Sequence, residues 1–104
     1  MEIKVVPHGI DAEKLERIAF ILKTVAHPVR LGIISLLESN KELTVTDICE
    51  TIQTEQSLTS HHLNTMKLKG ILNSRKKGRN VFYSLKEKDV TQIIRCLDNC
   101  GCNM

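Results

Sequence analysis

The sequence predicts a mainly α-helical domain with one small β-hairpin near its C-terminal end. Apolar residues recur at the spacing of amphipathic helices through most of residues 11–70, whereas β-forming residues gather at 81–85. Gly78 lies among cations at 76–79 and can supply the positive φ of a tight turn between two strands. The length of 104 residues and the hydrophobic fraction of 41% suit one domain, residues 1–104, with a single modest core.

A short flexible arm and a first helix are expected in residues 1–26. Pro7 and Gly9 discourage regular structure in residues 1–10, and Asp11 can cap a helix that runs to about residue 26. Phe20 and Ile21 lie off the core face of this helix, so either a contact between subunits or curvature of the core explains them. The predicted core face consists of Leu15, Ile18, Ala19, Leu22, Val25 and Ala26.

The second helix is predicted to lie at the centre of the core. Pro28 suits a first helical position, and residues 29–38 are apolar nearly all round. Ser39 and Asn40 are expected to end this helix.

Residues 42–70 fit two short helices joined by a tight turn, a helix-turn-helix pattern. Thr44 or Thr46 can cap the first, which should run to about Ile52. The inward positions of that first helix are Val45, Ile48, Cys49 and Ile52. The second helix, from Gln56 to Gly70, has two distinct faces. One face carries Ser57, Ser60, His61 and Asn64, and another carries Thr59, His62, Leu63 and Met66, of which three can pack inward. Small polar side chains offer hydrogen-bonding groups without bulk, which suits a groove of DNA.

Residues 71–85 predict a hairpin with a cationic tip at Lys76, Lys77, Gly78 and Arg79. Residues 61–104 contain nine Lys or Arg against three Asp or Glu, whereas residues 1–60 contain six against nine. A solvated surface is the common interpretation of an isolated basic run. Beside the polar helix, however, this run indicates contact with a phosphate backbone. Aromatic residues make up only 3% of the chain, which argues against a stacking platform for RNA or single strands.

A last helix is predicted over residues 86–100, with a cysteine-containing tail at 101–104. Its apolar stripe consists of Val90, Ile93, Ile94 and Leu97. Cys96 and Cys100 share one helix face, and Gly101 lets Cys102 approach them. No apolar run approaches the ~18–20 residues of a membrane span, and no secretory pattern is present. We therefore expect a cytoplasmic protein without a membrane partner, whose four cysteines are thiols or ligands and not disulfides.

Four segments together resemble the ArsR/SmtB-type repressors: LKTVAHPVRLGIISLL (22–37), ELTVTDIC (42–49), QSLTSHHLNTMKLKGIL (56–72) and KKGRNVFYSL (76–85). The resemblance spans about residues 18–97. It implies a winged helix-turn-helix fold of element order α-α-α-α-β-β-α, in which the hairpin at 71–85 is the wing. It also implies a prokaryotic homodimer, joined through its first and last helices, that binds an inverted-repeat operator in double-stranded DNA and leaves it when an inducer arrives.

The resemblance also implies roles for individual residues. The groove contacts would be Gln56, Ser57, Ser60 and His61, with Asn64 on the same face. Arg75, Lys77 and Arg79 would contact the DNA backbone, and His62 would be an inward structural histidine. The dimer contacts would come from Leu15, Phe20, Ile21, Val90, Ile93, Ile94 and Leu97.

The inducer does not follow from the family. Arsenic-sensing members carry ELCVCDLC where this chain has ELTVTDIC, so Cys49 alone cannot form that site and is expected to be a small buried side chain. The positions that match the zinc ligands of other members are Glu87, Asp89, Cys100 and Asn103, without the histidines that zinc prefers. Cys96, Cys100 and Cys102 could bind a thiophilic ion such as arsenite, cadmium, copper(I) or zinc, or undergo reversible oxidation or persulfidation. A tail with no sensing role is the third possibility.

Two other functional classes compete with the repressor. A winged-helix protein-interaction module would use the basic wing against an acidic partner, but hot spots of protein interfaces are usually large aromatics or arginine. An enzyme is not expected, because the histidines and cysteines form no triad-like pattern and no glycine-rich phosphate loop is present.

Overall fold

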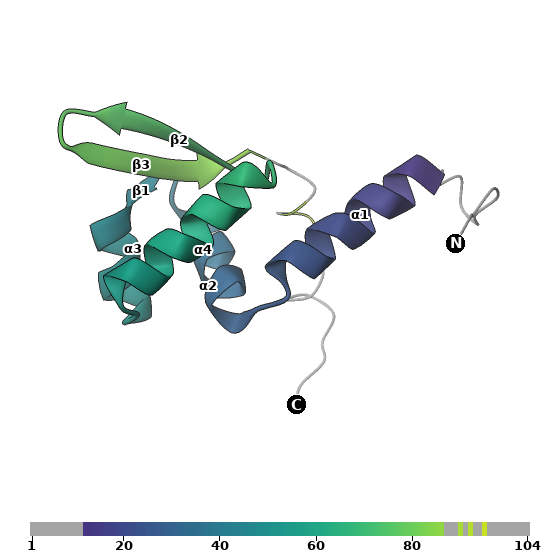
Figure 1. Cartoon of the computed structure of the whole chain (residues 1–104), viewed down its shortest axis with the longest axis horizontal. Coiled ribbons are helices and arrows are strands. Elements are labelled where there is room, and N and C mark those ends of the chain that lie inside the picture. The colour runs from purple at the N-terminus through teal and green to yellow at the C-terminus, as the bar shows by residue number, and fades with distance from the viewer. Residues whose placement is uncertain (1–11, 87–89, 91, 93–94, 96–104) are drawn as a thin grey trace.

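The computed structural model describes residues 12–86, 90, 92 and 95. Its elements follow the predicted mainly helical order with a β-hairpin wing, which confirms the predicted fold class. In Figure 1 the hairpin extends to one side of the helices, and α1 extends to the other. The elements are α1 (Ala12–Val25), α2 (Pro28–Ser39), β1 (Leu43–Thr44), α3 (Val45–Ile52), α4 (Gln56–Leu68), β2 (Leu72–Lys77) and β3 (Asn80–Leu85).

The sheet has three antiparallel strands in the order β1-β3-β2. In the hairpin, Leu72 pairs with Leu85 and Lys77 with Asn80, which leaves a two-residue turn in which Gly78 has φ of 63°. β1 was not predicted, because a strand of two residues is too short to show an alternating pattern. It pairs Thr44 with Phe82 and thereby joins the start of α3 to the wing.

Side chains at the helix starts explain where α2 and α3 begin. His27 Nδ1 accepts a hydrogen bond from the Val29 N–H at 3.1 Å, and Pro28 takes the first helical position. Thr44 caps α3 through a capping box, in which its hydroxyl accepts from the Asp47 N–H at 3.1 Å and the Asp47 carboxylate accepts from the Thr44 N–H. Of the two candidate caps, Thr44 therefore has this role and Thr46 does not.

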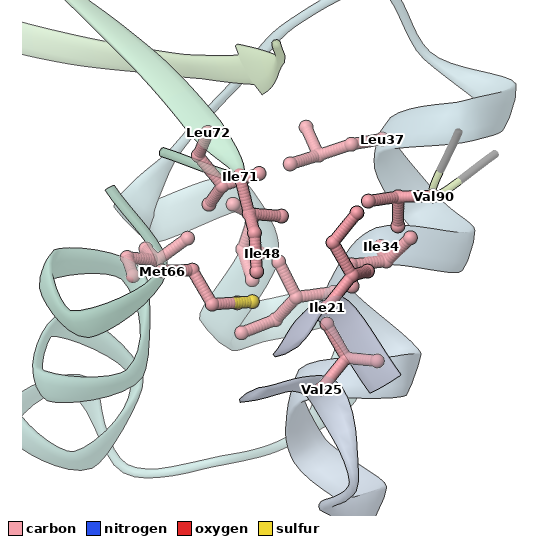
Figure 2. Packing of buried hydrophobic residues seen from close by; sticks show 11 residues of the cluster. Ile21, Val25, Ile34, Leu37, Ile48, Met66, Ile71, Leu72 and Val90 are labelled. Carbon is pink, nitrogen blue, oxygen red and sulfur yellow. The ribbon is translucent and has the colours of Figure 1, made fainter. Parts of the chain in front are cut away.

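The hydrophobic core combines side chains of the four helices with those at the start of β2 and with Val90 (Figure 2), and partly buried residues of β1 and β3 pack against it. Three of the four residues on the second face of α4 were expected to pack inward, and all four are buried, including the polar Thr59 and His62. Thr59 is satisfied by donating its hydroxyl to the Glu55 carbonyl at 3.0 Å. The buried apolar residues are Ile21, Val25, Ile33, Ile34, Leu37, Ile48, Leu63, Met66, Ile71, Leu72 and Val90.

The predicted core face of α1 is correct only in part: Val25 is buried and Leu15 and Ile18 are partly buried. Ile21, Thr24 and Val25 are buried, whereas Ala19, Leu22 and Ala26 are exposed. The inner face includes a threonine, which a search for apolar residues passes over. Thr24 is tolerated there because its hydroxyl donates to the Phe20 carbonyl at 2.9 Å. Ile21 therefore belongs to the core of its own chain and not to a second apolar surface.

Arg30 joins α1, α2 and α4. Its Nε–H donates to His62 Nδ1 at 2.9 Å, and its Nη1–H donates to the Thr24 carbonyl at 2.8 Å. The first bond requires the neutral His62 tautomer with its proton on Nε2, which is buried without a hydrogen-bond partner among the described residues. The His27 ring lies 4.5 Å from the His62 ring, centroid to centroid. The predicted structural role of His62 agrees with its exposure of 4%.

Several predicted segments lie outside the described residues: the arm at 1–10, the Asp11 cap, the tail at 101–104 and most of the helix at 86–100, in which Val90, Gln92 and Arg95 have helical backbone. Within the described ranges, no single helix is long and apolar enough to cross a membrane. Together, α1 and α2 reach that length and composition, but they are bent by 109° relative to each other.

The substitution His62→Asn is predicted to reduce the loss of stability on acidification. Burial, together with nearby His27 and Arg30, lowers the pKa of His62 below its ordinary value of about 6.5. The unfolded chain then binds the proton more readily, so the contribution of His62 is fully present above about pH 6.5 and is lost as the pH falls toward the folded-state pKa. Asparagine keeps an acceptor for Arg30 but does not titrate.

The measurement is urea unfolding of the wild type and His62→Asn from about pH 8 to about pH 5. The wild type should lose more unfolding free energy over this range. His61→Asn is the matched control, because His61 is its exposed neighbour on the same helix. Equal pH dependence of the wild type and His62→Asn would contradict the prediction.

Candidate nucleic-acid interface

The outer face of α4 is polar and accessible. Ser57, His61 and Asn64 are exposed, and Ser60 is partly buried. These residues follow the helical repeat on the side opposite the buried residues, so the packing of the inner face fixes their direction. The Ser57 hydroxyl donates to the Glu55 carboxylate at 2.7 Å just before the helix. Gly70, with φ of 80°, follows α4 and redirects the chain into β2.

Two leucines of α4 are also exposed, and neither was predicted to belong to the outer face. Leu58 is 43% exposed in the first turn, and Leu68 is 76% exposed at the end of the helix. Helical spacing places Leu68 in line with His61 and Asn64. The same spacing in the sequence could have assigned Leu68 to the outer face of α4.

The cations of the wing fall into two groups. Lys76, Lys77 and Arg79 are exposed and form no ion pair within the described part of the chain. Arg75, in contrast, donates its Nε–H to the Glu42 carboxylate at 2.9 Å and lies over the Phe82 ring. The hydrogen bond from Arg75 holds the pKa of the Glu42 carboxyl below its usual value. Arg75 is thus neutralised in this structure, unlike the cations at the tip.

A pocket of about 180 Å³ lies between the helix-turn-helix and the wing. Its walls come from the start of α3, the first residue of α4 and the turn of the hairpin. The lining residues are Thr44, Val45, Thr46, Gln56, Arg79, Asn80 and Val81. Gln56 and Arg79, which the sequence predicted separately, are thus brought together. Thr46 and Asn80 were not predicted, because their proximity depends on the β1–β3 pairing.

The predicted sensor lies outside the described residues, since Cys96, Cys100 and Cys102 are all in the undescribed part of the chain. Within the described ranges, no group of three or more His, Cys, Asp or Glu is arranged to hold a metal ion. Cys49 is a free, partly buried thiol on α3. Cys49 packs on the predicted inward side of the helix, beside the fully buried Ile48.

The predicted dimer residues divide into three groups. Phe20 is 46% exposed and Leu15 is partly buried, so both retain surface for a second subunit. Ile21 and Val90 are almost fully buried within their own chain and offer little surface. Their contribution to a dimer contact stays a prediction. Leu22, predicted for the core, is instead 41% exposed on α1. Ile93, Ile94 and Leu97 lie outside the described residues.

Comparisons with known proteins agree with this geometry. A family described as "Bacterial regulatory protein, arsR family" matches residues 27–74, from the cap of α2 into β2. The transcriptional repressor PagR of Bacillus anthracis is 39% identical over 89% of this chain and 93% of PagR. Its crystal structure superposes with a TM-score of 0.74 over 84% of this chain and 99% of that chain, at 38% identity.

A second repressor is also similar in structure. The transcriptional repressor BigR of Xylella fastidiosa has a TM-score of 0.81 at 28% identity, over 88% of this chain and 93% of BigR. The match to PagR covers nearly the whole length of both proteins, and the matching family segment contains the complete helix-turn-helix. The chain therefore belongs to the ArsR/SmtB family of transcriptional regulators.

Proposed function

We propose that this protein is a homodimeric repressor that binds an inverted repeat in double-stranded DNA through α4 and the wing. The proposal is carried by the exposed polar face of α4 beside the wing-tip cations, which form no ion pair among the described residues. α4 would enter the major groove, where Ser57, Ser60, His61 and Asn64 offer hydrogen bonds to base edges.

The wing would supply affinity that does not depend on base sequence. Lys77 and Arg79 are exposed cations that can replace counterions at backbone phosphates. Arg75 was predicted in the same role, but it would first have to leave Glu42. We therefore assign the larger backbone contribution to Lys77 and Arg79.

A homodimer accounts for apolar side chains that the single chain leaves exposed. Phe20 and Leu22 on α1 are more than two-fifths exposed although both are large and apolar. A two-fold dimer through α1 and the last helix would cover this surface. It would also place the two α4 helices in successive major grooves about 34 Å apart, which requires an inverted repeat.

The inducer that we propose acts on the three thiols of the C-terminal segment. Cys96, Cys100 and Cys102 are close in sequence and can supply the trigonal thiolate set that soft ions such as arsenite or cadmium prefer. The same thiols can form a disulfide or persulfide reversibly. Either change would occur in the segment that belongs to the proposed dimer contact, which gives it a route to the DNA-binding surface.

The double substitution Ser60→Ala/His61→Ala is predicted to reduce sequence preference, whereas Arg79→Ala should weaken binding to all duplexes alike. Loss of base contacts costs roughly 1–3 kcal/mol of discrimination per good contact, while loss of one phosphate contact reduces the salt slope by about one. The measurement is the Kd for duplexes from the native promoter region and for scrambled duplexes at several salt concentrations. Absence of preference for any inverted repeat by the wild type would contradict the repressor function.

The substitution Glu42→Gln is predicted to strengthen DNA binding. It removes the carboxylate that neutralises Arg75 and leaves Arg75 available to a phosphate. Affinity for all duplexes should rise by roughly two- to tenfold, with a steeper salt dependence. Glu50→Gln is the control, because Glu50 is an exposed acid on α3 that pairs with no described cation of the wing. An equal gain in both variants would mean that net charge alone is responsible.

Changing Cys96, Cys100 and Cys102 together to serine is predicted to prevent release from DNA by the inducer. Operator release should be measured with arsenite, cadmium, zinc, copper(I) and persulfide, for the wild type and the triple variant. The affinity of the triple variant for operator DNA without inducer should equal that of the wild type. Cys49→Ser is the matched control. Release of the triple variant at the same inducer concentration as the wild type would exclude these thiols as the sensor.

A further inference from the structure

The pocket between α3, α4 and the wing lies between the two surfaces that the proposed function assigns to DNA. Its wall on the helix-turn-helix side includes Gln56, the first residue of α4, and its wall on the wing side includes Arg79. The β1–β3 pairing of Thr44 with Phe82 fixes the start of α3 relative to the hairpin. The pocket is therefore part of the folded framework and does not depend on flexible side chains alone.

The chemistry of the pocket favours an anion. Arg79 is the only charged residue among those that line it, and Thr46, Gln56 and Asn80 add exposed side chains that can donate hydrogen bonds. Two carboxylates are next to lining residues in the chain, and both accept hydrogen bonds from their own neighbours. Asp47 accepts from the Thr44 N–H within the capping box, and Glu55 accepts from the Ser57 hydroxyl. Because Thr44 caps α3, the Thr46 hydroxyl is not needed for that purpose. One water needs about 10–15 Å³ of such space, so a volume of about 180 Å³ has room for a phosphate group and several bridging waters.

We infer that this pocket binds one phosphate of the operator backbone, with Thr46 as a contact to that phosphate. If α4 lies in the major groove and the wing lies outside it, the strand that borders the groove must cross the pocket. Arg79 supplies the charge-assisted hydrogen bond, and Thr46 and Gln56 supply neutral ones. This inference rests on the proposed function and assigns Gln56 to the backbone instead of a base.

The role of Thr46 can be tested with Thr46→Val, which keeps the branched shape and removes the hydroxyl. We expect a roughly tenfold weaker Kd for native and scrambled duplexes alike, the effect of one hydrogen bond to a charged group. The salt slope should stay unchanged because no charge is lost, whereas Arg79→Ala should lower it by about one. Thr51→Val is the matched control, since Thr51 is an exposed threonine of α3 whose hydroxyl bonds to the Asp47 carbonyl. Urea unfolding should show equal stability of the two variants.

The position of the contact can be tested with duplexes that carry a neutral methylphosphonate at one backbone position at a time. For the wild type, a methylphosphonate at one position in each half-site should weaken binding. In Thr46→Val, a methylphosphonate at that same position should have little further effect, whereas its effects at other positions should be unchanged. A Thr46→Val protein that binds as tightly as the wild type, or a loss that couples to no backbone position, would overturn the inference.

Two further outcomes separate the alternatives. The first distinguishes binding of a backbone phosphate from binding of a free anion, and the second distinguishes failure of the phosphate site from failure of the proposed repressor function. If inorganic phosphate at constant ionic strength shifts the Thr46 amide resonance while Thr46→Val leaves the DNA affinity unchanged, the pocket takes a free anion and the backbone contact is overturned. If the wild type prefers no inverted repeat but Thr46 still couples to one phosphate, the sequence-specific repressor function fails and the phosphate site stands.

Discussion

The structure depends on how α4 is packed, because one helix must both complete the core and present a polar surface. Leu63 and Met66 are fully buried, and Thr59 and His62 accompany them on the same side. At 3.6 residues per turn, burial of this side requires that Ser57, His61 and Asn64 face the solvent. A small rotation of α4 would bury a polar group without a partner, so the core fixes the orientation of the proposed DNA-binding face.

Polar contacts within the fold link this helix to its surroundings. Arg30 donates to both His62 and the Thr24 carbonyl, so α4 is tied to the end of α1, the helix with exposed apolar side chains. On the other side, β1 joins α3 to the wing. The helix-turn-helix thus has fixed connections to the proposed dimer helix and to the cationic hairpin. A ligand that changes the dimer contact therefore has a physical connection to the DNA-binding surface.

Charge on the wing is arranged by local pairing as well as by composition. Arg75 is neutralised by Glu42, whereas Lys76, Lys77 and Arg79 form no ion pair within the described residues. The effective positive surface is therefore concentrated at the tip of the hairpin. Arg79, one of these cations at the tip, lines the pocket at the start of α3 and α4.

Local sequence patterns were sufficient to predict the fold class, the two faces of α4 and the cationic hairpin. These features follow from helical periodicity and turn chemistry, which act between near neighbours in the chain. Only the folded chain revealed the core face of α1, the short strand β1, the pairing of Arg75 with Glu42 and the convergence of Thr46, Gln56 and Arg79. Most of these features bring together residues that are distant in sequence. The core face of α1 depends instead on whether a buried polar group, such as the Thr24 hydroxyl, has a hydrogen-bond partner. Local sequence patterns predict neither the long-range contacts nor the hydrogen bonds of buried polar groups, because the partner residues come together only when the chain folds.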